Sequence, residues 1–143
     1  MKPIFTILLL FVSNFYSYAG SCEKVSGSFK AVKVADCPYG LIEIKLNEQN
    51  NSLSIFVSRD FDQGSGYRLN YIADGQAQIG RGEFEGEKYT ASCADNHIRT
   101  RGEFNILRHP LVKEYNINDE RNLVYQESFE GSDYIKSCEL ERL

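Results

Sequence analysis

Short runs of alternating apolar and polar residues, separated by turn-forming residues, occupy most of the chain after residue 25. In one run, Ile42, Ile44 and Leu46 alternate with charged residues. Successive side chains of a β-strand point to opposite faces, so such a run predicts a strand with one buried face. Pairs such as Asp74-Gly75 between the runs are typical of hairpin turns. The pattern predicts an all-β domain: an antiparallel up-and-down β-barrel of about eight to ten short strands, or a sandwich.

Three stretches depart from the simple pattern. Residues 25–34 shift the parity of their apolar positions, which predicts one strand with a bulge. Alternation continues to Ile106 in residues 98–106, which predicts a strand of that length. Residues 110–117 fit either a short helix opened by Pro110 or a strand. We favour the strand, because an internal repeat aligns this stretch with residues 67–72.

That repeat relates residues 84–93 to residues 129–138. Six of the ten positions are identical, including a Glu-Gly pair and a final cysteine. Each copy predicts the end of one strand, a tight turn and a second strand that ends in cysteine. The copies indicate either a duplicated hairpin or convergence on the same turn-forming residues.

The N-terminal segment has the three parts of a secretory signal peptide. A short basic start precedes an apolar stretch, and Ser17-Tyr18-Ala19 supplies small residues for cleavage. The apolar stretch is too short to span a bilayer. We therefore expect residues 1–19 to be a signal peptide and residues 20–143 to form a single β-barrel domain that is periplasmic or secreted. Ala19-Gly20-Ser21-Cys22 resembles a bacterial lipoprotein box, but the usual leucine is missing, so we expect no lipid anchor at Cys22.

The chain has four cysteines, an even number that predicts two disulfide bonds stapling the domain of an exported protein. Spacing does not determine the pairing. We favour Cys22 with Cys37 and Cys93 with Cys138, the two equivalent positions of the repeat. A bond between Cys22 and Cys138, which would join the first strand to the last, remains an alternative.

Signals for catalysis, metal ions and cofactors are weak. There are two histidines, no Cys-x-x-Cys pair and no Gly-x-Ser-x-Gly motif. Asp60-Phe61-Asp62 begins like a calcium loop, but Tyr71 stands where the loop needs a glutamate. The net charge of −4 argues against nucleic-acid binding. We expect a protein without enzyme activity, metal, cofactor, nucleic-acid partner or membrane span.

A set of tyrosines shares the predicted interior with small residues such as Ala73 and Ala91. Small residues leave room, and buried tyrosine hydroxyls need partners. The interior is therefore either a filled core or a cavity for a small amphipathic ligand. Lys136 has the same inward parity and would need a partner such as Glu127 or an acid group of the ligand. The expected ligand-binding residues are Tyr67, Tyr71, Tyr89, Tyr125, Tyr134 and Lys136.

Two resemblances extend these expectations. Gly27-Ser28-Phe29 resembles the Gly-x-Trp that opens the first strand of lipocalins and other small secreted β-barrels of the calycin type. That likeness implies a barrel that binds a small ligand in an apolar cavity. Gly64-Ser65-Gly66-Tyr67 resembles a loop of small periplasmic lysozyme inhibitors. It implies the alternative function, an interaction module that inhibits a secreted or cell-wall enzyme through loops 59–66 and 107–111. The partner is then a small molecule or an extracytoplasmic protein.

Overall fold

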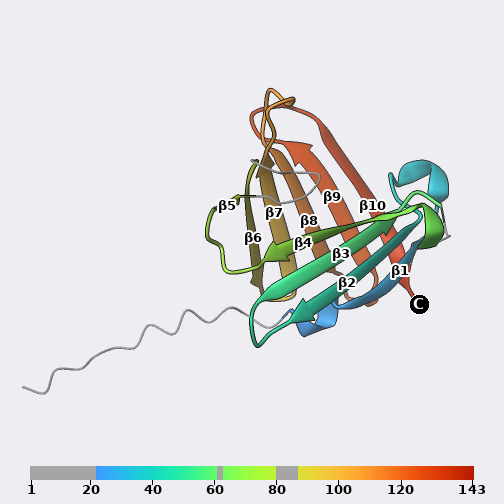
Figure 1. Ribbon diagram of the computed structural model, residues 1–143. Helices are drawn as coiled ribbons and strands as arrows, with labels where there is room; N and C mark the ends of the chain where they lie inside the picture. Colours follow the sequence, from blue (N-terminus) through green and yellow to red (C-terminus); the bar gives the residue numbers. More distant parts are fainter. Residues whose placement is uncertain (1–21, 61–62, 80–86) are drawn as a thin grey trace, which may run out of the picture.

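The computed structural model describes residues 22–60, 63–79 and 87–143. These residues form three short 3-10 helices and ten strands, and no longer helix (Figure 1). The helices are η1 (Glu23–Val25), η2 (Val34–Asp36) and η3 (Gln63–Ser65). The strands are β1 (Gly27–Ala31), β2 (Leu41–Asn47), β3 (Ser52–Ser58), β4 (Tyr67–Ile72), β5 (Gln78–Ile79), β6 (Lys88–Ala94), β7 (His97–Glu103), β8 (Leu111–Ile117), β9 (Leu123–Phe129) and β10 (Ile135–Arg142). The predicted all-β architecture is confirmed.

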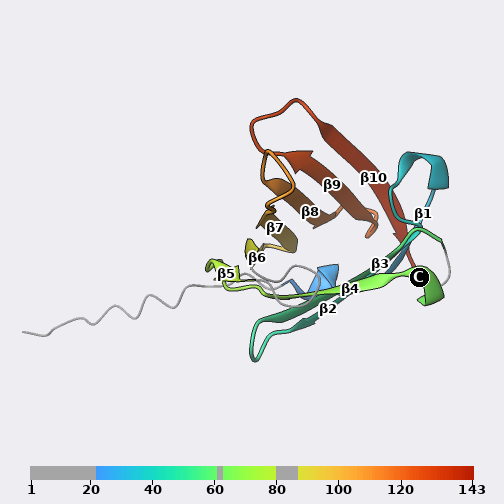
Figure 2. The ribbon, with the colours of Figure 1, turned by 45° about the horizontal axis from the view of Figure 1, so that its top comes forward.

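The ten strands form a single antiparallel sheet that curls into a half-barrel. Their order is β4-β3-β2-β1-β10-β9-β8-β7-β6-β5, so the first strand pairs with the last. Figure 2 shows β2, β3 and β4 facing β7, β8 and β9 across the interior. The two edge strands are β4 and β5, and an isolated bridge between Asp74 and Ser92 links the two margins of the sheet. The concave face of this sheet is therefore enclosed by strands from both halves of the chain.

The apolar residues that alternate with polar ones along the strands form the core on the concave face. Ile42 lies opposite Val57 and Ile44 lies opposite Ile55, and all four side chains are buried. The same parity continues across β1 to Phe29, which is also fully buried. Burying each of these apolar side chains contributes about 1.5–3 kcal/mol relative to leaving it exposed. The strand runs recognised in the sequence thus identify the buried face correctly.

Connections between the strands alternate between the two ends of the half-barrel, as they must in an antiparallel meander. Residues 32–40, 59–60, 63–66, 104–110 and 130–134 all lie at one end, which we call the connector end. In Figure 1 the loops formed by residues 104–110 and 130–134 meet at the top of the back strands. Side chains near the C-terminal end of β9 and the N-terminal end of β8 therefore lie toward the connector end.

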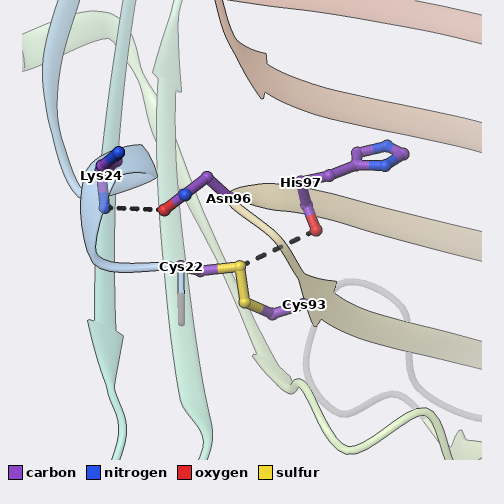
Figure 3. Close-up of a disulfide and its surroundings, with 5 residues drawn as sticks. All are labelled: Cys22, Lys24, Cys93, Asn96 and His97. Atoms are coloured by element: carbon purple, nitrogen blue, oxygen red, sulfur yellow. Dashed lines mark hydrogen bonds between the residues drawn. A yellow bond between two sulfur atoms is a disulfide. The ribbon is translucent and has the colours of Figure 1, made fainter. Parts of the chain in front are cut away.

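The two disulfides pair differently from the favoured scheme. Cys22 is bonded to Cys93 and Cys37 to Cys138, with Cα–Cα distances of 6.0 and 5.3 Å. The predicted pairing was wrong because Cys93 is on β6 and Cys138 on β10. Three strands separate them, about 19 Å at the usual strand spacing, which a disulfide cannot bridge. Figure 3 shows the Cys22–Cys93 bond, where the backbone N–H of Lys24 also donates to Asn96 Oδ1 at 3.2 Å.

Several strand boundaries also differ from expectation. The single bulged strand expected over residues 25–34 is instead β1 flanked by η1 and η2. The strand expected to reach Ile106 ends at Glu103, and Ile106 is 90% exposed in the following loop. The strand interpretation of residues 110–117 is confirmed by β8. In the second repeat copy the turn is present, with Gly131 at a φ of 78°. The first copy's turn and the expected signal peptide lie outside the described residues.

Candidate ligand-binding site

Three neighbouring strands place a row of charged residues on the concave face. Lys113 of β8 lies directly opposite Glu127 of β9, which lies opposite Lys136 of β10. These three have the same parity as the fully buried Tyr115 and Tyr125, so they belong to the inward side of the sheet. The row runs across β8, β9 and β10 near the connector end of the sheet.

Glu127 is held by two tyrosine hydroxyls. Tyr125 donates to Glu127 Oε2 at 2.7 Å, and Tyr134 donates to Glu127 Oε1 at 3.2 Å. Burial, the neighbouring phenols and the Glu127 carboxylate all raise the pKa of Tyr125. The hydroxyl therefore stays protonated and remains a donor to the carboxylate. Among the described residues, no ion pair joins Glu127 to either flanking lysine.

Lys113 is the charged group of the row that is most affected by burial. Its Nζ donates to the Tyr39 hydroxyl at 3.5 Å and lies 5.8 Å from the centroid of the Tyr39 ring. Burial lowers the pKa of Lys113, and the Glu127 carboxylate opposes that shift only in part. Lys113 nevertheless retains some accessible surface. A desolvated ammonium without a carboxylate within ion-pair distance, among the residues described, is a position that favours an anion.

Tyrosine rings surround this row. Tyr39 packs edge-on against Tyr125 with ring centroids 5.5 Å apart, and Tyr115 packs against Tyr125 at 5.3 Å. The hydroxyls of Tyr39 and Tyr67 lie 3.1 Å apart. Burial raises the pKa of Tyr39, so its phenol stays neutral beside the Lys113 ammonium. The cluster combines one desolvated cation with several neutral donors and flat apolar surfaces.

The expected binding residues fall into three groups. Tyr125 and Tyr134 meet at Glu127, where the register also places Lys136. Tyr67 joins the cluster through Tyr39. Tyr71 lies close enough to Tyr115 and Tyr67 for their phenols to interact electrostatically, and it also forms an edge-on pair with Tyr89, with ring centroids 5.2 Å apart.

Two of these tyrosines are less enclosed than predicted. Tyr67 and Tyr134 are 41% and 44% exposed, although both were expected in the interior. Tyr67 is the first residue of β4, and Tyr134 immediately precedes β10. Both lie at the connector end, where the side chains are only partly covered.

Sequence reasoning missed Lys113 and Tyr39. Lys113 shares the parity of Leu111, Tyr115 and Ile117, so the alternation of that strand was a signal that could have identified it. Tyr39 was interpreted as part of a turn. Its inward position follows from the Cys37–Cys138 bond, which holds this connection beside β10. No local pattern indicates that placement.

Other regions carry weaker chemistry. A shallow groove of about 420 Å³ lies between β1 and β2, away from the charged row, and is lined by Ser26, Gly27, Ser28, Glu43, Ile44, Lys45 and Leu46. Within residues 22–60, 63–79 and 87–143, no group of three or more His, Cys, Asp or Glu side chains is arranged to hold a metal ion. None of the helices in that same part of the chain is long and apolar enough to cross a membrane.

The fold of this chain is similar to that of small β-barrel proteins with a calycin-like fold, as the sequence resemblance implied. Lipid binding protein 8 of Caenorhabditis elegans has a TM-score of 0.63 at 12% identity, covering 87% of this chain and 99% of that one. A variant of the REP1-NXSQ fatty acid transporter has a TM-score of 0.62 at 14% identity, covering 85% and 99%.

A third solved structure also has a similar fold. Secretory abundant heat soluble protein 4 of Ramazzottius varieornatus has a TM-score of 0.60 at 8% identity, covering 84% of this chain and 95% of that one. At these identities the likeness concerns the fold alone. The sequence matches no family model and no curated protein.

Proposed function

We propose that this protein is a non-enzymatic carrier that binds a small amphipathic molecule with an anionic headgroup on its concave face. The observation that carries the proposal is the Lys113 ammonium. It is desolvated, faces inward and has no carboxylate at ion-pair distance among the described residues. An anionic headgroup beside Lys113 would supply the missing countercharge.

The balance of inward charges supports an anionic ligand over a neutral one. The row contains two lysines and one glutamate, and the tyrosine hydroxyls donate to the glutamate. This leaves an excess of positive charge on a face whose other side chains are mainly aromatic and aliphatic. Burying an uncompensated charge is costly, so a bound anion would be stabilised there more than at an exposed lysine.

The apolar part of the concave face suits the tail of such a molecule. Side chains such as Ile55 and Ile98 are completely buried on the inward side. The similar structures include proteins described as a fatty acid transporter and a lipid binding protein. These names support a long-chain carboxylate as the first ligand to test.

The test is calorimetric titration of the protein with stearate, with an alkyl sulfate and with the neutral stearyl alcohol. We expect both anions to bind and the alcohol to bind more weakly. Lys113→Met should reduce the affinity for stearate by about tenfold or more, the worth of a charge-assisted hydrogen bond. Lys45→Met is the matched control, because Lys45 is exposed and pairs with Glu43 on the outer face. Its affinity should equal that of the wild type.

Two results would contradict the proposal. One is the absence of binding of either anion by the folded wild-type protein. The other is unchanged stearate affinity in Lys113→Met. Either result would direct attention to loops 59–66 and 107–111 and to the alternative of an enzyme inhibitor.

We also infer that the protein is exported and loses residues 1–19. The support comes from the sequence pattern of that segment and from the pairing of all four cysteines in disulfides. Disulfides persist in oxidising compartments and are rare in the cytosol. The bond between Cys22 and Cys93 leaves no thiol at Cys22 for a lipid.

A further inference from the structure

Tyr115 holds a buried hydroxyl whose hydrogen bonding is incomplete. The residue is 0% exposed, and its hydroxyl has no hydrogen-bond partner among the described residues. About nine in ten buried polar groups in proteins have a partner, and leaving one unpaired costs about 1–3 kcal/mol. The neighbouring hydroxyls of Tyr125, Tyr39 and Tyr67 all have partners. Tyr115 is therefore the exception within its own cluster.

The hydroxyl of Tyr115 lies within the inward cluster. Its electrostatic neighbours are the phenols of Tyr71 and Tyr67 on β4, the phenol of Tyr39 in the β1–β2 connection and the carboxylate of Glu127 on β9. The ring leans against Tyr125 at 56° between planes. The hydroxyl therefore lies in the interior, among side chains from both halves of the sheet.

Tyr115 and Lys113 lie on the same strand and face the same side of the sheet. Both are on β8, two residues apart and on the same face, so their Cα atoms are separated by about 7 Å along the strand. Lys113 is nearer the connector end, and Tyr115 is one step deeper. Burial raises the pKa of Tyr115 well above its usual value, so its hydroxyl remains a donor at physiological pH.

We propose that the Tyr115 hydroxyl is a second polar contact for the ligand, which selects an amphipathic anion carrying an oxygen function, such as a hydroxyl or a keto group, within its chain. This inference rests on the proposed function. The headgroup would lie at Lys113, and the Tyr115 hydroxyl would donate to the chain oxygen deeper in the half-barrel. A plain hydrocarbon chain would leave the same hydroxyl unpaired.

The experiment compares stearate with mid-chain hydroxystearate and mid-chain oxostearate by calorimetric titration. The wild type should bind the oxygenated acids about fivefold more tightly than stearate, the worth of one neutral hydrogen bond. Tyr115→Phe keeps the ring and removes the hydroxyl, so it should bind stearate as the wild type does and should lose the preference for the oxygenated acids. Thermal unfolding of the unliganded variant should show no loss of stability, because the hydroxyl removed has no partner.

Tyr125→Phe is the matched control, since Tyr125 is equally buried but its hydroxyl already donates to Glu127. It should change the affinity for all three acids by the same factor and keep the preference. Equal binding of the three acids by the wild type would overturn the inference while leaving the proposed function intact. So would a preference that survives in Tyr115→Phe. If no acid binds, the proposed function itself fails.

Discussion

At the scale of single residues, burial shifts the pKa values of the inward lysine and of the inward tyrosines in opposite directions. The ammonium of Lys113 is a desolvated charge, and burial lowers its pKa. The phenols of Tyr39 and Tyr125 are also desolvated, but burial raises their pKa values and keeps them neutral. In both cases burial disfavours the charged form of the group. The phenols therefore remain neutral donors around the lysine ammonium.

This contrast predicts a pH dependence for ligand binding. An anion binds the protonated form of Lys113. The affinity should therefore be highest below the pKa that Lys113 has in the unliganded protein, and it should fall as the pH rises through that pKa. Because burial lowers that pKa from 10.5, the fall should begin at a lower pH than an exposed lysine would give. Stearate titrations from neutral to alkaline pH measure it directly.

The same titrations on Lys113→Met distinguish the contribution of Lys113 to the pH dependence from that of the neighbouring groups. These groups are Lys136, Glu127 and the surrounding tyrosines. The variant should show a much flatter profile. A decline of the wild-type size in the variant would assign the pH dependence to another group.

At the scale of elements, the turn between β9 and β10 shows how one residue determines a hairpin. Gly131 has a φ of 78°, a conformation that side chains with a Cβ rarely adopt. The turn is completed by the N–H of Ser132, which donates to the Phe129 carbonyl at 3.1 Å. It is also tied to the neighbouring loop, because the N–H of Glu130 donates to the Pro110 carbonyl at 2.9 Å. This hairpin brings Tyr134 to Glu127.

Gly131→Ala should therefore lower the free energy of unfolding by about 1–2 kcal/mol, the usual cost of a left-handed conformation for a residue with a Cβ. A Cβ would have room, since its nearest contact would be His109 Nδ1 at 3.8 Å, so the loss reflects the backbone conformation alone. Urea unfolding measures the change. Gly131→Asn should lose less, because asparagine tolerates this conformation. Equal losses for both variants would contradict the explanation.

At the scale of the whole molecule, the two disulfides hold distant parts of the chain together. Cys22–Cys93 joins the segment before β1 to β6 across 71 residues, and Cys37–Cys138 joins the β1–β2 connection to β10 across 101 residues. Long loops of this kind restrict the unfolded chain strongly. The second bond also brings Tyr39 to the inward cluster, so it contributes to the candidate site as well as to stability.

Protein recovered from an oxidising export compartment should begin at Gly20, and a non-reducing tryptic digest should contain peptides linking Cys22 to Cys93 and Cys37 to Cys138. Replacing Cys22 and Cys93 together by alanine should lower the free energy of unfolding by about 2–4 kcal/mol. A peptide linking Cys22 to Cys37 would contradict the pairing described here. A chain that retains Met1 would contradict removal of the leader.

The sequence by itself determined the class of fold and the buried faces of most strands, because alternation and turn formation depend on residues that are close together in the chain. Ile42 and Ile44 could be assigned to the core in this way, and Tyr125 to the interior. The disulfide pairing, the position of Tyr39 and the row formed by Lys113, Glu127 and Lys136 were decided only by the tertiary structure. The physical reason is that these contacts depend on strand order and register, which are set when distant strands pair, and no local pattern specifies them.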